Sequence, residues 1–249
     1  FACNFYPADE AFLKNVKEEV TDNIKRVRHH ACLGLWSGNN EIEVIFQLAV
    51  SDDPAIVAMR KQFGMPEMEE GQKTQIYRDY QKIFCEVVPA LIAEIDPQTD
   101  YVPTSPIGHD SSDIPDGASL FSGSLIGDTH YYLAYDNLSP YPTFREKQFR
   151  FVSEMGFQSY PSYKTIRDFT LPEDRKPDSK VMLSHQKCNN GNPIIEAYMS
   201  QDYAVPADFE LYVYASQILA GEIQRYEVEH LRRDIGLCMG VITWQLNDC

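Results

Sequence analysis

Apolar residues recur along the chain at the spacings of helices, and short apolar runs separate these segments. The clearest helical pattern lies near the N-terminus, where apolar residues are three and four positions apart: Ala11, Phe12, Val16, Val20, Ile24 and Val27. Acidic residues open this segment and basic residues close it, as the helix dipole favours. Further helical patterns cover residues 54–63, 74–95, 142–149, 179–188, 192–201 and 207–233.

The short apolar runs between these helices predict five strands. They cover residues 31–36, 100–104, 131–135, 151–155 and 240–244, and residues 1–6 resemble the end of a sixth. Strands that alternate with helices favour a parallel sheet covered by helices. We therefore expect an α/β fold with five parallel strands and a long polar loop over residues 107–127.

Composition and charge narrow the classes of function. Hydrophobic residues make up 43% of the chain and charged residues 24%, which is typical of a globular protein and not of a disordered one. The net charge of −15 argues against nucleic acid and anionic membranes as partners. No apolar run approaches the ~18 residues of a membrane span. The cysteines and histidines have no metal-ligand spacing, so we expect no metal and no cofactor.

Reactive side chains gather where the predicted strands end, which is where parallel α/β folds place their active sites. Glu41 follows the first strand and Glu154 lies in the fourth. Two carboxylates at one edge are what glycoside hydrolysis requires. Trp244 could form an apolar platform for a sugar ring, and His130 and Tyr135 could bind its hydroxyls. The same groups also have purely structural uses at strand ends.

Three dense motifs make the assignment more specific. Residues 35–41 (Leu-Trp-Ser-Gly-Asn-Asn-Glu) resemble the acid/base motif of the β-mannosidases of glycoside hydrolase family two. Residues 151–161 (Phe-Val-Ser-Glu-Met-Gly-Phe-Gln-Ser-Tyr-Pro) resemble the nucleophile motif of this family, and residues 244–249 resemble its final barrel strand. Weaker matches at residues 1–7, 127–132 and 229–233 extend the resemblance over nearly the whole chain.

The resemblance implies a TIM (β/α)8 barrel, of which this chain supplies roughly strands 3/4 to 8. Residues 1–249 would form the C-terminal two-thirds of this catalytic domain, with the first strands and the flanking sandwich domains outside the chain. These strands alone would form an open arc, or be closed by another copy or a partner segment. A soluble protein is expected, and the sequence indicates no localisation.

The resemblance also implies a retaining enzyme that removes terminal β-D-mannose. Glu154 would be the nucleophile and Glu41 the acid/base, with the two carboxyl groups ~5–5.5 Å apart. Asn40 would bind the sugar 2-hydroxyl, unless it caps the following helix, and Trp244 would carry the sugar ring, unless it is core. His130 and Tyr135 complete the expected substrate contacts.

Two departures from the family pattern and several alternatives stay open. Met155 replaces an aromatic residue, and Phe46 is the only aromatic where the family has a tryptophan. The alternatives are another family-two β-glycosidase, of β-galactosidase, β-glucuronidase or glucosaminidase type, a non-catalytic carbohydrate-binding barrel, or a chain without activity on its own. The expected partners are a β-mannoside oligosaccharide or glycoconjugate and the rest of the parent polypeptide, and a homo-oligomer is left open.

Overall fold

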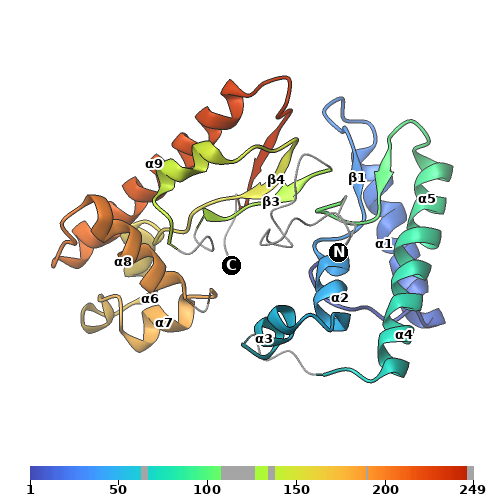
Figure 1. Cartoon of the computed structure of the whole chain (residues 1–249), viewed down its shortest axis with the longest axis horizontal. Coiled ribbons are helices and arrows are strands. Elements are labelled where there is room, and N and C mark those ends of the chain that lie inside the picture. Colours follow the sequence, from blue (N-terminus) through green and yellow to red (C-terminus); the bar gives the residue numbers. More distant parts are fainter. Residues whose placement is uncertain (63–66, 108–126, 134–137, 189, 246–249) are drawn as a thin grey trace. The chain divides into compact units, whose positions relative to one another are not determined.

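The chain folds into two compact units, Phe1–Asp128 and Thr129–Cys249, seen in a computed structural model (Figure 1). The structure describes residues 1–62, 67–107, 127–133, 138–188 and 190–245. Each unit has its own apolar core and its own parallel sheet.

Unit 1 is mostly helical. Its elements are α1 (Glu10–Val27), β1 (Trp36–Ser37), α2 (Ile42–Val50), α3 (Pro54–Gln62), α4 (Glu70–Tyr80), the π-helix η1 (Gln81–Val87), α5 (Val88–Ile95) and β2 (Tyr101–Val102). The core is formed by Val16, Ile24, Ile42, Ile83, Phe84, Val88 and Ile92. Strands β1 and β2 pair in parallel, with Trp36 beside Tyr101 and Ser37 beside Val102.

A π-helix interrupts the single helix predicted over residues 74–95. Pro89 has no N–H to donate, and the Val88 N–H reaches back five residues to the Ile83 carbonyl. The Tyr101 hydroxyl donates to the Phe84 carbonyl instead, at 2.7 Å. A side chain of β2 therefore supplies the hydrogen bond that the proline cannot.

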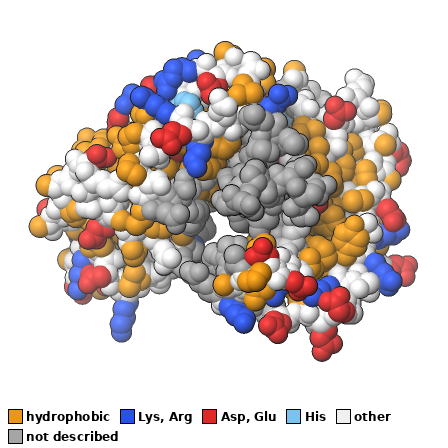
Figure 2. All heavy atoms as spheres, viewed as in Figure 1, with side chains coloured by type: hydrophobic (Ala, Val, Ile, Leu, Met, Phe, Trp, Pro, Cys, Tyr) orange, Lys and Arg blue, Asp and Glu red, His pale blue; other side chains and the backbone are white. Residues whose placement is uncertain are grey.

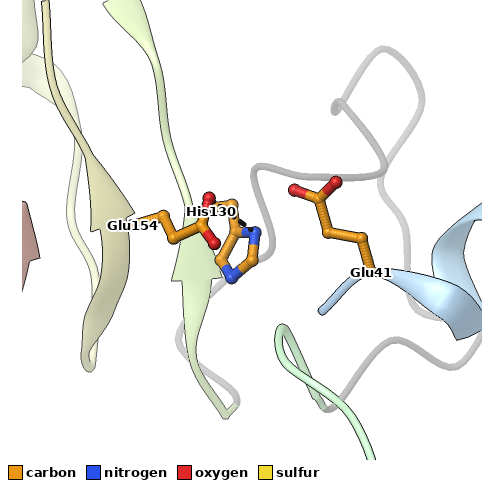
Figure 3. A group of neighbouring side chains, drawn as sticks. All are labelled: Glu41, His130 and Glu154. Atoms are coloured by element: carbon orange, nitrogen blue, oxygen red, sulfur yellow. Dashed lines mark ion pairs between the residues drawn. The ribbon is translucent and has the colours of Figure 1, made fainter. Parts of the chain in front are cut away.

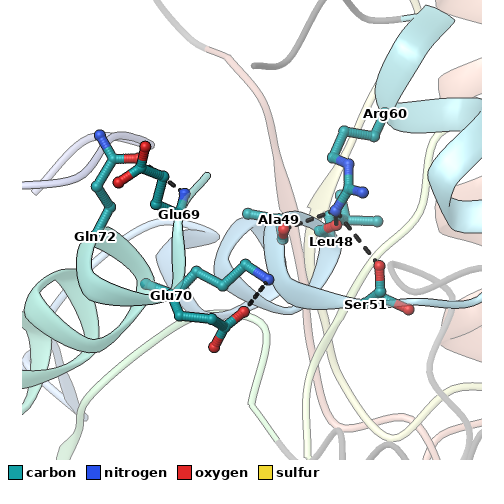
Figure 4. Close-up of polar contacts among 8 residues, drawn as sticks. Leu48, Ala49, Ser51, Arg60, Glu69, Glu70 and Gln72 are labelled. Atoms are coloured by element: carbon teal, nitrogen blue, oxygen red, sulfur yellow. Dashed lines mark hydrogen bonds and ion pairs between the residues drawn. The ribbon is translucent and has the colours of Figure 1, made fainter. Parts of the chain in front are cut away.

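Helix α2 is fixed at its C-terminal end by an arginine. Arg60 of α3 donates from one guanidinium nitrogen to the carbonyl of Ala49 at 2.7 Å, and to those of Leu48 and Ser51 at 3.4 Å each (Figure 4). A cation at this position satisfies terminal carbonyls and complements the helix dipole. This contact matters because α2 begins directly after Glu41.

Unit 2 is a three-stranded parallel sheet with helices. Its elements are β3 (Thr129–His130), the 3-10 helix η3 (Tyr141–Glu146), β4 (Val152–Met155), α6 (Tyr163–Phe169), the 3-10 turn η4 (Pro172–Asp174), α7 (Lys180–His185), α8 (Gly191–Asp202), α9 (Phe209–Arg233) and β5 (Val241–Thr243). The strand order is β3-β4-β5, and the long helix α9 contacts α6, α8 and η3.

The predicted parallel α/β class is confirmed, with corrections to two strands. The first strand is limited to Trp36–Ser37, and Leu35 is 50% exposed, so the apolar run at residues 31–36 is not a buried strand. The third strand lies at Thr129–His130, just before the predicted range. The described strands form two sheets and no closed barrel, so the barrel stays a prediction. No helix among the described residues is long and apolar enough to cross a membrane.

One carboxyl group in α9, that of Glu227, is buried without a hydrogen-bond partner among the described residues. Glu227 is 1% exposed, and neither of its carboxylate oxygens has a hydrogen-bond partner in the described part of the chain. Burial raises its pKa from 4.5 to about 8, because the charged form loses its hydration. The folded state therefore holds a proton that the unfolded state releases.

We expect this proton to make stability fall as pH rises. Between about pH 4.5 and about pH 8 the unfolded chain loses the proton first, so the free energy of unfolding decreases over this window and levels off above it. The full difference is on the order of 5 kcal/mol. Urea unfolding of Glu227→Gln should lack this component of the pH dependence, whereas Glu229→Gln, an exposed neighbour, should retain it. Equal pH profiles for the parent and Glu227→Gln would contradict the assignment.

Candidate active site

Glu41 stands at the junction between β1 and α2 in an unusual backbone conformation. Its φ of 58° is left-handed, which is uncommon for a residue with a side chain and is often found at functional sites. Its N–H donates to the Ser105 carbonyl at 2.8 Å, and its carboxylate accepts from the Cys3 thiol at 3.5 Å. The side chain is half-buried, so the carboxyl group keeps access to solvent or a ligand.

The neighbouring asparagines have different roles. Asn39 accepts a hydrogen bond from the N–H of Ile42, the first residue of α2, so the capping role that the sequence left open for Asn40 belongs to Asn39. The half-buried side chain of Asn40 makes no hydrogen bond with the described residues. The Asn40 amide is therefore available for a ligand.

Glu154 lies in β4 and is contacted by two side chains of the adjacent segment, His130 in β3 and Tyr132 just after it. The Tyr132 hydroxyl donates to its carboxylate at 2.8 Å, and His130 Nδ1 lies 3.5 Å from the same oxygen (Figure 3). His130 is 1% exposed and is paired with Glu154 in the parallel register of β3 and β4. A hydroxyl donor such as Tyr132 orients a carboxylate that accepts from it. His130 lies beside the same carboxylate oxygen of Glu154.

Trp244 follows β5 and is not part of the core. The residue is 55% exposed, and its backbone N–H donates to the Met155 carbonyl at 2.8 Å. A Cβ on Gly156 would lie 2.5 Å from the Trp244 carbonyl oxygen, so only glycine permits this close approach. The indole is free of the core and can present a face to a ligand. Tyr135, the remaining predicted substrate contact, lies outside the described residues.

Two residues of the site were missed by sequence reasoning. Tyr132 is two positions after His130, and alternation along an extended segment would place both on one face. Asn39 stands in the acid/base motif but was given no role of its own, because a pair of asparagines does not reveal which one faces the helix. The position of Tyr132 could therefore have been predicted from the sequence, whereas the role of Asn39 could not.

Each unit therefore presents one glutamate near a parallel strand: Glu41 follows β1 and Glu154 lies within β4. Each carboxylate accepts a hydrogen bond from a side chain of its own unit. This is the class of site expected of an α/β glycoside hydrolase. The known proteins to which the chain is similar are glycoside hydrolases of one kind.

The chain is similar over its full length to β-mannosidases. It is 29% identical over 254 residues to β-mannosidase B of Aspergillus niger, 30% identical over 254 residues to that of Aspergillus clavatus and 29% identical over 262 residues to the β-mannosidase of Capra hircus. Each match covers 100% of this chain and 28% of the relative. No protein-family profile matches the chain.

A solved structure gives the same result. The crystal structure of β-D-mannosidase from Dictyoglomus thermophilum matches with a TM-score of 0.76 and 28% sequence identity, over 100% of this chain and 27% of that one. The resemblance to β-mannosidases predicted from the motifs is confirmed: the chain is similar to these enzymes over its whole length and spans little more than a quarter of theirs.

Proposed function

We propose that these residues form part of the catalytic domain of a retaining β-mannosidase, which removes terminal β-D-mannose from the non-reducing end of oligosaccharides or glycoconjugates. The observation that carries the proposal is the similarity to β-mannosidases across the whole chain. Further support comes from Glu41 and Glu154, each of which is oriented by hydrogen bonds within its own unit.

The proposed reaction is a double displacement. The Glu154 carboxylate attacks the anomeric carbon while the bond to the leaving oxygen breaks, and Glu41 gives its proton to that oxygen. Glu41, now a carboxylate, then takes a proton from water, and the resulting hydroxide equivalent releases mannose from Glu154. The two inversions restore the original β configuration, and the mechanism requires no metal or cofactor.

The proposed substrate contacts come from the acid/base motif, from the motif of the final strand and from residues between them. The Asn40 amide binds the sugar 2-hydroxyl, and the exposed indole of Trp244 stacks on the apolar face of the ring. His130 and Tyr135 contribute further polar contacts, with His130 also holding Glu154. In this proposal the five parallel strands are part of a (β/α)8 barrel, roughly strands 3/4 to 8, and the sandwich domains of the family flank it.

The test measures kcat/KM on a panel of glycosides and the anomeric configuration of the first product. The natural polypeptide that carries these 249 residues is assayed on nitrophenyl β-mannoside, β-galactoside, β-glucuronide and β-glucosaminide. We expect the highest kcat/KM on the mannoside, with β-mannose as the first product seen by NMR. A preference for another sugar would identify a different family-two glycosidase. Binding without turnover would identify a carbohydrate-binding barrel, and α-mannose as first product would exclude retention.

Tyr132→Phe is expected to slow turnover without greatly changing substrate binding. The variant removes only the hydroxyl that donates to Glu154 at 2.8 Å. A hydrogen bond to a charged group contributes about 1.5–3 kcal/mol, which corresponds to roughly a 10- to 150-fold loss in kcat. Tyr163→Phe, in α6, is the matched control and should keep the parent rate. A Tyr132→Phe variant with unchanged kcat would show that this hydroxyl does not support the nucleophile.

A further inference from the structure

The left-handed backbone at Glu41 requires a local cause, and the residues around it supply one. Glu41 is followed at once by α2, so its side-chain direction depends on where that helix begins. The segment before it is tied to Ser105, three residues beyond β2: the Ser105 N–H donates to the Asn39 carbonyl at 2.9 Å, and the Glu41 N–H donates to the Ser105 carbonyl. Backbone pairing therefore fixes both sides of Asn40.

The Asn39 side chain links the same three parts of the fold. It is 3% exposed, and its amide nitrogen donates to the Pro103 carbonyl at 2.6 Å. Its oxygen accepts from the Ile42 N–H at 3.1 Å and from the Thr104 hydroxyl at 2.9 Å. Thr104 is itself fully buried. One amide thus joins the segment before Glu41, the helix after it and the residues that follow β2.

Two further contacts hold the β2 side of this network. Asp128 accepts from the Ser105 hydroxyl at 2.6 Å and from the Ile107 N–H at 2.6 Å. The Pro103–Ser105 segment is therefore anchored on its other side as well. Because the anchor is fixed, the orientation of the Asn39 amide sets the start of α2 and, with it, the direction in which Glu41 leaves the backbone.

We propose that Asn39 is a positioning residue for the acid/base Glu41, acting through the Thr104 hydroxyl and the first N–H of α2. The inference rests on the proposed function, because it assigns Asn39 a share in proton transfer. A general acid must lie within about 2.6–3.2 Å of the oxygen that it protonates, and a displacement of about 1 Å can cost a hundredfold in rate. Asn39 is buried and its amide is used in hydrogen bonds to Pro103, Ile42 and Thr104, so its effect is carried by the placement of Glu41.

The experiment compares two leaving groups in the natural polypeptide. A dinitrophenyl mannoside loses its leaving group without a proton, whereas a mannobioside needs one. For Asn39→Ala we expect kcat/KM to fall about a hundredfold on the mannobioside and less than about threefold on the dinitrophenyl mannoside. A loss of folded protein would instead lower both values by the same factor.

Thr104→Val keeps the proposal testable if Asn39→Ala folds poorly. It preserves side-chain shape and removes only the hydroxyl that donates to Asn39, so we expect the same selectivity with a smaller loss, about three- to tenfold on the mannobioside. The matched control is Thr170→Val: Thr170 is also buried, and its hydroxyl donates to the Ile166 carbonyl at the end of α6. This control should leave the ratio of the two kcat/KM values unchanged.

The outcomes separate this inference from the proposed function. If Glu41→Ala shows no selectivity for the leaving group, the acid/base assignment itself fails. If Glu41→Ala is selective but Asn39→Ala and Thr104→Val slow both substrates equally, the function stands and the positioning role of Asn39 is wrong. Selectivity in all three variants, absent from Thr170→Val, supports the proposal.

Discussion

Glu154→Ala is expected to abolish turnover in the natural polypeptide, with a fall in kcat of about 10⁵-fold or more. Without the carboxylate no covalent glycosyl-enzyme can form, and water in its place attacks far more slowly. Because Tyr132 and His130 both contact Glu154, the alanine leaves a space lined by the Tyr132 hydroxyl and the His130 ring. Small anions should enter this space.

Azide provides the decisive measurement for Glu154. In the alanine variant azide should replace the nucleophile and attack once, so the product is α-mannosyl azide, the inverted anomer, detected by NMR. Glu173→Ala, which removes an exposed carboxylate from η4, is the control and should retain the parent rate without azide. Residual mannose release near the parent rate in Glu154→Ala would remove Glu154 from the mechanism.

The fold class could be predicted from the alternation of strands and helices. The helices were recognisable by apolar residues three and four positions apart, and the strands by short continuous apolar runs. The prediction was less accurate where apolar residues are not buried. Residues 31–36 have the composition of a core strand, yet Leu35 is exposed and only Trp36 and Ser37 pair with β2. Burial depends on what packs against a segment, and the sequence of that segment alone does not contain this information.

The helical spacing over residues 74–95 shows a second limit. The apolar pattern correctly predicted a helical segment, but not the π-helix at its centre. That feature depends on Pro89 and on Tyr101, a residue of a later strand whose hydroxyl bonds the Phe84 carbonyl. A contact between distant positions of the chain cannot be read from periodicity, which reports only near neighbours.

The two candidate reactive residues of the site could be proposed from the sequence, but the residues that support them could not. Glu41 and Glu154 stand in dense motifs, so their chemistry could be proposed directly. The asparagine that caps α2 is Asn39, and the choice between it and Asn40 depends on side-chain rotation in the folded chain. Supporting residues such as Asn39 and Tyr132 are identified by distances, because amide and hydroxyl groups have many uses in any sequence.

Glu41→Ala is expected to change the dependence of the reaction on the leaving group. For a mannobioside, kcat/KM should fall about 10²- to 10⁴-fold, because the departing alkoxide no longer receives a proton. For a dinitrophenyl mannoside, whose leaving group is already stable as an anion, kcat/KM should change only a few-fold. Its kcat should still fall, because release of mannose from Glu154 requires the same residue as a base.

Azide separates this role from that of Glu154. In Glu41→Ala an anionic nucleophile needs no general base, so azide should restore kcat on the dinitrophenyl substrate and yield β-mannosyl azide, the retained anomer. Glu43→Gln is the matched control, since Glu43 lies on α2 two residues later and its carboxylate accepts from the Tyr80 hydroxyl at 3.4 Å. That variant should show neither leaving-group selectivity nor azide rescue. Equal losses on both substrates in Glu41→Ala, with no effect of azide, would contradict the acid/base assignment, because general acid catalysis must depend on how much the leaving group needs a proton.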